Sequence, residues 1–214
     1  HPRNKSKARK ADKKVKTIAG RLERNLSPDS IHQKTILFFK QVLTQTRGSK
    51  HKIYSLHEPD VLCISKGKEH KKYEFGNKVS IVKTQNTGVI VGAMGFRNEF
   101  DGHTLKPALE QVNRMIGKEP KTVSVDRGYR GNTQIGATQV QIPKPFNDKK
   151  QTKYLQKKLK EAHRKRAAIE PVIGHLKTDH RLGRNFYKGI IGDNINIMLA
   201  AAAFNFKRMM NKWK

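Results

Sequence analysis

Acidic residues are scarce in this sequence. Its 214 residues contain 17 Asp and Glu against 46 Lys and Arg, so the formal net charge at pH 7 is +29. A surface this positive repels itself and is normally neutralised by a polyanion, and nucleic acid is the expected partner. An anionic membrane fits less well, because membrane-binding helices confine their charge to one face. A ribosomal-type basic protein that binds RNA is an open alternative.

Cysteine and long apolar runs are scarce too. The single cysteine, Cys63, excludes an internal disulfide framework and suits a reducing cytoplasm. The longest apolar run, residues 197–204, is far shorter than the roughly 20 residues of a membrane span. The basic N-terminus lacks the apolar segment of a secretory signal. The sequence therefore predicts a soluble, cytoplasmic protein without a membrane segment.

The first part of the chain is basic and helical in pattern. Residues 1–24 are dominated by Lys and Arg, so a helix there is solvated or lies along phosphates. Residues 27–45 predict a second helix, with Ser27 as its N-cap and Pro28 in its first turn. We expect a basic helical segment over residues 1–48, as a linker or insertion, in front of a domain over residues 49–214.

The pattern of the second part predicts a mixed α/β domain. Short segments rich in β-branched and aromatic residues predict three antiparallel strands and then two buried ones. The expected strands cover residues 52–59, 73–84, 88–96, 121–126 and 138–143. A helix over residues 101–117, ending at Gly117, separates the two groups, with Leu105, Leu109, Val112 and Ile116 on one face.

Two helical stretches complete the chain. Residues 149–182 predict one long polar helix, and residues 189–213 predict a second helix with an apolar face. The residues of that face, most simply explained by core packing, are Ile191, Ile195, Met198, Leu199, Ala202, Phe206, Met209 and Trp213.

Asp126 stands at the expected carboxyl end of a strand that the pattern makes central. Gly128 and Gly131 allow a sharp turn after it. In open α/β sheets, ligands bind at this edge.

A second acid lies among cations. At about 100° per residue, His163, Arg166, Glu170 and Lys177 fall within an arc of roughly 60° on one helical face. Pro171 complicates this geometry, because it removes a backbone donor and can kink the helix.

Asp126 and Glu170 have two possible explanations. Carboxylates brought together from distant segments persist where a divalent cation neutralises them, and oxygen ligands favour Mg²⁺ or Mn²⁺. Such ions activate a water or a DNA 3′-hydroxyl for phosphodiester chemistry, while the neighbouring cations hold the strand. Alternatively, Asp126 is a turn former and Glu170 makes ordinary salt bridges with Arg166 and Lys177. Spacing alone leaves both open.

The segments VDRGYRG and IEPVIGHLKTDHRLGRN resemble the catalytic domain of bacterial insertion-sequence transposases of the Asp-Asp-Glu (DDE) type. In that family an Asp-Arg-Gly-Tyr strand end carries the second catalytic acid, which corresponds to Asp126. The last acid lies in a helix with a Tyr, two residues, Arg, three residues, Glu, six residues, Lys pattern. Here these positions are His163, in place of the usual Tyr, and Arg166, Glu170 and Lys177.

The resemblance, over residues 50–210, implies a ribonuclease-H-like fold: a mixed sheet of antiparallel and then parallel strands, flanked by helices. It implies metal-dependent DNA strand cleavage and strand transfer at insertion-sequence ends, with Mg²⁺ or Mn²⁺ bound by Asp126 and Glu170. The implied partners are transposon-end and target DNA, and a second copy of the chain in the transposition complex. The implied location is the bacterial cytoplasm, at the nucleoid. The implied DNA-binding residues are Arg127, Arg130, His163, Arg166 and Lys177.

The family's first catalytic Asp has no counterpart in this sequence. In the family it lies on the opening strand, upstream of a basic helical segment like residues 1–46. Neither Asp60, in a linking turn, nor Asp101, at a turn or helix cap, is expected to replace it. The resemblance therefore implies an N-terminally truncated transposase that lacks its first strand and holds metal weakly. The alternative is an inactive, non-specific DNA-binding remnant.

Overall fold

A computed structural model describes the fold over residues 4–26, 31–65, 72–97, 99–144 and 152–213. The chain forms two compact units, His1–Val61 and Leu62–Lys214. The predicted domain boundary after residue 48 stays a prediction.

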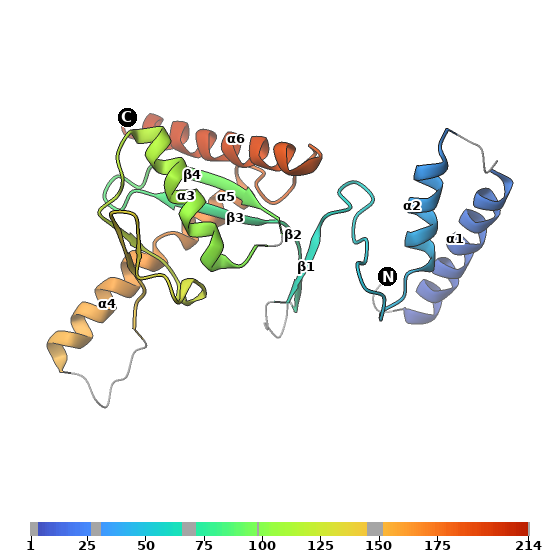
Figure 1. Cartoon of the computed structure of the whole chain (residues 1–214), viewed down its shortest axis with the longest axis horizontal. Helices are drawn as coiled ribbons and strands as arrows, with labels where there is room; N and C mark the ends of the chain where they lie inside the picture. The colour runs from blue at the N-terminus through green and yellow to red at the C-terminus, as the bar shows by residue number, and fades with distance from the viewer. Residues whose placement is uncertain (1–3, 27–30, 66–71, 98, 145–151, 214) are drawn as a thin grey trace. The chain divides into compact units, whose positions relative to one another are not determined.

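The first unit contains two solvated helices, α1 (Lys5–Asn25) and α2 (Gln33–Thr44) (Figure 1). Neither helix has a buried residue, as the charge pattern predicts for α1. An ion pair of 3.0 Å between the Lys40 ammonium and the Glu23 carboxylate links them. The second helix begins later than expected, and its predicted cap, Ser27 and Pro28, lies outside the described residues.

The second unit has the predicted mixed α/β class (Figure 1). Its sheets are the antiparallel pairs β1-β2 and β3-β4 and the three-stranded sheet β5-β7-β6, in which β5 and β7 are parallel. The elements are β1 (Leu62–Ser65), β2 (Tyr73–Gly76), β3 (Lys78–Lys83), β4 (Ile90–Phe96), α3 (Asp101–Ile116), β5 (Thr122–Ser124), the 3-10 turn η1 (Arg127–Tyr129), β6 (Gln134–Ile135), β7 (Thr138–Gln141), α4 (Lys153–Ala167), α5 (Glu170–Thr178) and α6 (Gly189–Met210).

Two strand predictions are wrong. Residues 52–59 form no strand, because the backbone of Ile53 bonds instead to the side-chain amide of Gln45, with both distances near 3 Å (2.9 and 3.0 Å). Residues 73–84 form two strands in different sheets, β2 and β3, separated at Asn77. The Asn77 amide donates to the Asp193 carboxylate of α6 at 2.6 Å, which fixes this break.

Helix α3 matches its prediction closely. Leu105, Leu109 and Val112 are buried, while Ile116 at the end of the stripe is exposed. Gly117 ends the helix in the left-handed conformation, with φ of 64°, which glycine adopts without strain. The helix contacts β3 and β4 as well as η1, so it connects the antiparallel and parallel parts of the unit.

The backbone edge of β4 is covered by side-chain amides. Each amide comes from a helix that packs on the strand, and two of the three bond both the N–H and the C=O of one residue. The pairs are Asn205 with Ile90, Gln111 with Ala93, and Asn194 with the N–H of Gly95. This pairing satisfies an edge that would otherwise attract another strand.

The prediction that Asp126 follows a central strand is wrong. The strand β5 lies at the edge of its sheet, and the side chains of Thr122 and Ser124 are exposed. Among the described residues, one edge of β5 and one edge of β3 have no strand partner. The apolar residues Val123 and Val125 that suggested a central strand pack on one side only, against α3.

The predicted long helix over residues 149–182 is two helices, α4 and α5. Pro171 explains the break, because it cannot donate to the carbonyl of Ala167, where α4 ends, and its ring crowds that turn. Pro171 itself is tolerated in the first turn of α5.

The predicted core face of the last helix is wrong. The stripe on α6 faces solvent: Ile191 is 75% exposed, Leu199 57% and Phe206 60%, and Trp213, beyond the end of the helix, is 76% exposed. The opposite side packs on β4 and α5 through Ile197, Ala200 and Ala201. The small alanines let the helix approach the strand closely. This close packing, and not the size of the apolar stripe, decides which face of α6 is buried. By length and composition alone α6 could cross a bilayer, a test that core helices also pass.

The amides on β4 give a stability prediction. Gln111→Leu leaves both backbone groups of Ala93 without a partner and should lower the free energy of unfolding by about 1–3 kcal/mol. Asn113→Leu, a similar change at an exposed position of the same helix, should cost much less. Urea denaturation followed by circular dichroism measures both. Equal costs would contradict this role of Gln111.

Candidate active site

Asp126 lies two residues beyond β5 and caps η1. Its Oδ1 accepts a hydrogen bond of 2.8 Å from the backbone N–H of Gly128, and the side chain is exposed. The N–H of Val125 donates to the Gln141 carbonyl at 3.0 Å, so the parallel pairing with β7 reaches the residue before the acid. The acid therefore stands at the end of a strand, as predicted.

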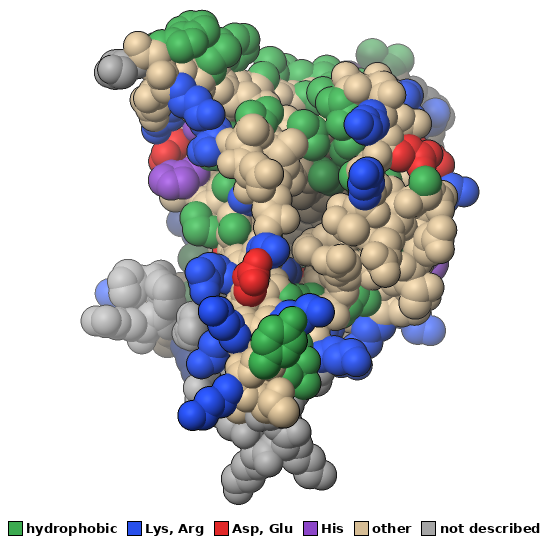
Figure 2. Space-filling view, turned by 90° about the vertical axis from the view of Figure 1, so that its left-hand side faces the viewer, with side chains coloured by type: hydrophobic (Ala, Val, Ile, Leu, Met, Phe, Trp, Pro, Cys, Tyr) green, Lys and Arg blue, Asp and Glu red, His purple; other side chains and the backbone are tan. Residues whose placement is uncertain are grey.

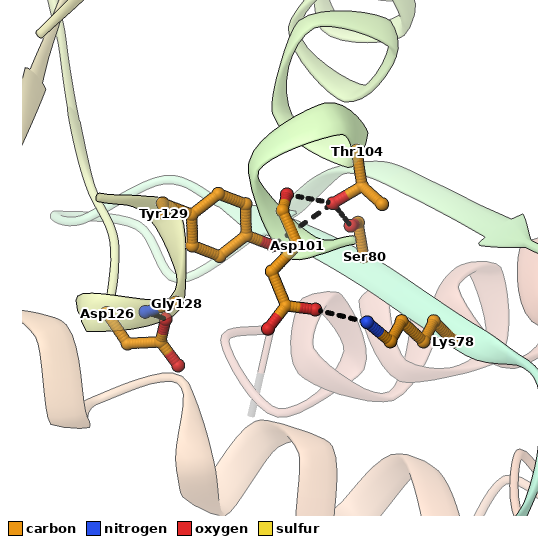
Figure 3. A network of polar contacts seen from close by, with 7 residues as sticks. All are labelled: Lys78, Ser80, Asp101, Thr104, Asp126, Gly128 and Tyr129. Atoms are coloured by element: carbon orange, nitrogen blue, oxygen red, sulfur yellow. Dashed lines mark hydrogen bonds and ion pairs between the residues drawn. The ribbon is translucent and has the colours of Figure 1, made fainter. Parts of the chain in front are cut away.

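Asp101, which the sequence did not place in a site, lies beside Asp126 (Figure 3). A Cβ on Gly128 would meet Oδ2 of Asp101 at 2.7 Å and Oδ1 of Asp126 at 3.0 Å. Both carboxylates therefore approach the same point over Gly128. The Lys78 ammonium pairs with the other oxygen of Asp101 at 3.0 Å. The sequence signal for this close approach is Gly128. A 3-10 turn accepts other residues, but only glycine, which has no Cβ, leaves room for the Asp101 carboxylate here.

The turn after Asp126 is held by a buried threonine of α3. Thr104 is 2% exposed, and its hydroxyl lies 3.3 Å from the Tyr129 hydroxyl and 3.3 Å from the Ser80 hydroxyl (Figure 3). Asn132 adds a bond of 3.1 Å from its amide to the Gly102 carbonyl. The loop that carries Asp126 is thus bonded to the first turn of α3.

Glu170 is the first residue of α5, after the break. Its Oε1 accepts from the Arg166 guanidinium at 3.0 Å, so this pair forms as the spacing predicted. Helix α4 contacts β5, which brings the strand before Asp126 against the helix before Glu170. Lys177 is exposed on α5.

His163 is engaged with the backbone. Its Nε2 lies 2.9 Å from the carbonyl oxygen of Lys144, and because a carbonyl only accepts, the imidazole N–H donates. Its expected DNA contact stays a prediction.

Basic side chains gather on and around α4 (Figure 2). Leu159 is the one buried residue of this helix, so most of its charged residues face solvent. Glu161 interrupts the positive charge, and the hydrogen bond from Lys165, 2.7 Å away, holds its pKa below the ordinary value. Arg127 and Arg130, next to Asp126, are exposed as well. These residues form an exposed, positively charged surface.

A further charged cluster lies at the end of α5, on the side of the helix opposite Glu170. Hydrogen bonds from Thr178 and His175 lower the pKa of Asp179 to about 2, so this carboxylate stays charged. It borders a cavity of about 460 Å³ whose lining includes Val172, Phe204 and Lys207. At 100° per residue, this side of α5 points away from Glu170.

The carboxylates have the oxygen donors that Mg²⁺ and Mn²⁺ prefer. Asp126 and Asp101 converge, but in the part of the chain that the structure describes no group of three or more His, Cys, Asp or Glu is close enough to hold a metal ion. Asp126 and Glu170 thus fit a metal by chemistry, and further ligands are needed to complete a site.

A family model described as Transposase DDE domain matches residues 47–206. Among curated proteins and solved structures, none matches the chain. The matched segment covers most of the sequence and contains Asp126, Glu170 and the elements around them, which confirms the resemblance found in the sequence. The chain belongs to the DDE transposase domain family.

Proposed function

We propose that this chain is the catalytic part of an insertion-sequence transposase, which cleaves and transfers DNA strands at the ends of the element. The family match over residues 47–206 carries this proposal. Membership implies a ribonuclease-H-like fold, phosphodiester cleavage, DNA binding and an intracellular location with DNA. The specific ends and the role of each residue are proposals.

In this proposal Asp126 and Glu170 hold Mg²⁺ or Mn²⁺. One oxygen of Asp126 is fixed by the Gly128 amide, and one oxygen of Glu170 is fixed by Arg166. Each acid keeps its second oxygen for a metal. When bound, such ions lower the pKa of a water or a DNA 3′-hydroxyl and stabilise the leaving oxygen. The residues themselves supply fixed oxygen ligands in a positive surface.

The surrounding cations bind the DNA backbone. Arg127, Arg130 and Lys177 are exposed, so their charged groups can reach the phosphates. Arg166 is already paired, and it serves both to orient Glu170 and to add positive charge. His163 supports the end of α4 through its hydrogen bond to the Lys144 carbonyl. It can contact DNA through this nitrogen only when that bond is broken.

The third acid is proposed to come from a further strand. Among the described residues, β3 and β5 each have one free edge, and α3 contacts both the β3-β4 pair and the turn after β5. A strand that pairs with these edges would carry the family's first acid, which this chain then lacks. Asp101 does not supply it in this proposal, because it is the first residue of α3 and does not lie on a strand.

The alternative is a DNA-binding protein without catalysis. It is favoured by one observation, that the described residues hold no group of three metal-binding side chains. Metal-dependent cleavage by the 214-residue chain itself would decide against it. Preference for RNA over duplex DNA in a competition assay would instead indicate an RNA-binding protein.

The catalytic proposal predicts that Asp126→Asn and Glu170→Gln each lower Mg²⁺-dependent nicking of end DNA by at least about 100-fold, because each removes a ligand charge. The assay uses the chain joined to the proposed further strand that carries the family's first acid. Glu110→Gln, an exposed acid on α3, is the matched control and should keep full activity. Equal nicking by wild type and Asp126→Asn would refute the assignment.

The basic surface gives a second prediction. Lys153, Lys157 and Arg164 lie on one face of α4 and are exposed. Replacing all three by Gln should weaken duplex binding and lower the slope of log affinity against log salt by up to about 3, roughly 0.9 for each lost phosphate contact. Fluorescence anisotropy at several salt concentrations measures this.

The matched control replaces Lys106, Arg114 and Lys118 by Gln, on or just after α3. This variant has the same charge change and should keep most of the salt dependence. Equal losses in both variants would show that α4 has no special place in DNA binding.

A further inference from the structure

We infer that the first turn of α3 positions Asp126, and that Thr104 does so through the hydroxyl of Tyr129. This inference rests on the proposed metal-binding role of Asp126. Neither Thr104 nor Tyr129 touches the reacting groups in this scheme, so both are positioning residues. Figure 3 shows them between strand β3 and the loop of Asp126.

The hydroxyl of Thr104 uses its whole hydrogen-bonding capacity. It donates to the Asp101 carbonyl at 2.8 Å. A hydroxyl has one proton and two acceptor sites, so its contacts with Ser80 and Tyr129 must be bonds that it accepts. One buried oxygen therefore joins three elements, β3, α3 and η1.

Close packing at Gly128 makes the connection rigid. Asp101 Oδ2 lies where a side chain at position 128 would begin, at 2.7 Å from the Cβ position. The turn of Asp126 thus fits directly against the end of α3, and Asn132 fastens its far side to Gly102. On the buried side of the loop, the hydrogen bond between the hydroxyls of Tyr129 and Thr104 connects it to α3.

The bond to Tyr129 bears on Asp126 through η1. The N–H of Tyr129 lies 3.4 Å from the Asp126 carbonyl, so the ring and the acid belong to one turn. If the Tyr129 hydroxyl is removed, the turn loses its bond to the buried threonine. A metal ligand must be held within about 0.5 Å of its productive place, so the carboxylate remains but binds metal less well.

The experiment uses the 214-residue chain and Mn²⁺ as the probe. Paramagnetic broadening of the Gly128 amide signal reports on metal near Asp126. Tyr129→Phe should raise the Mn²⁺ concentration for half-broadening about 10-fold, the scale seen for groups that orient metal ligands. Tyr154→Phe, at a 77% exposed tyrosine on α4, is the matched control and should leave it unchanged.

Variants of Thr104 test the same bond from the other side. Thr104→Val removes the hydroxyl at nearly constant volume and should weaken the Mn²⁺ response as Tyr129→Phe does. Thr104→Ser keeps the hydroxyl and should restore it, which a purely packing role would not predict. The double variant Thr104→Val/Tyr129→Phe should bind Mn²⁺ no more weakly than the weaker-binding single variant, because both substitutions remove the same hydrogen bond.

The outcomes separate this inference from the proposed function. If Asp126→Asn abolishes the broadening while Tyr129→Phe responds like wild type, the positioning inference is wrong and the metal assignment stands. If Asp126→Asn broadens like wild type, the metal assignment fails. Hydrogen exchange at the Gly128 amide then decides the positioning: faster exchange in Tyr129→Phe supports it, and unchanged exchange overturns it.

Discussion

The packing of α3 is the constraint on which the rest of the second unit depends. The antiparallel pair β3-β4 and the sheet of β5, β6 and β7 share no strand pairing among the described residues. Helix α3 meets both, burying Val112 toward β4 and Leu105 and Leu109 toward the parallel strands. Because α3 contacts both parts, the position of the site at its first turn depends on the packing of both.

Charge balance distinguishes Asp126 from Asp101, Glu170 and Asp179. Asp101 is paired with Lys78, Glu170 with Arg166, and Asp179 with His175 and Lys207. Asp126 is held by a neutral backbone amide instead. Among the described residues no ion pair neutralises Asp126, so its negative charge can favour a divalent cation locally, although the net charge of +29 of the whole chain opposes cation binding.

The sequence predicted the features that depend on local patterns. The stripe and the glycine at its end located α3, and the glycines after Asp126 located a turn. Long-range choices were not predictable. Helix α6 has apolar residues on two sides, and periodicity could not tell that Ile197 and the alanines are buried while Leu199 is exposed. The approach of Asp101 to Asp126 depends on how α3 packs, which no local pattern states. The metal and DNA roles stay predictions.

The break between α4 and α5 matters more for Glu170 than the single helical face that its spacing suggested. Pro171 ends the first helix and makes Glu170 the first residue of the next, where unpaired backbone N–H groups and the helix dipole stabilise a negative side chain. Arg166 still reaches it across the break. The start of α5 thus favours the negative charge of Glu170 and Arg166 pairs with it, while Lys177 lies two turns further along α5.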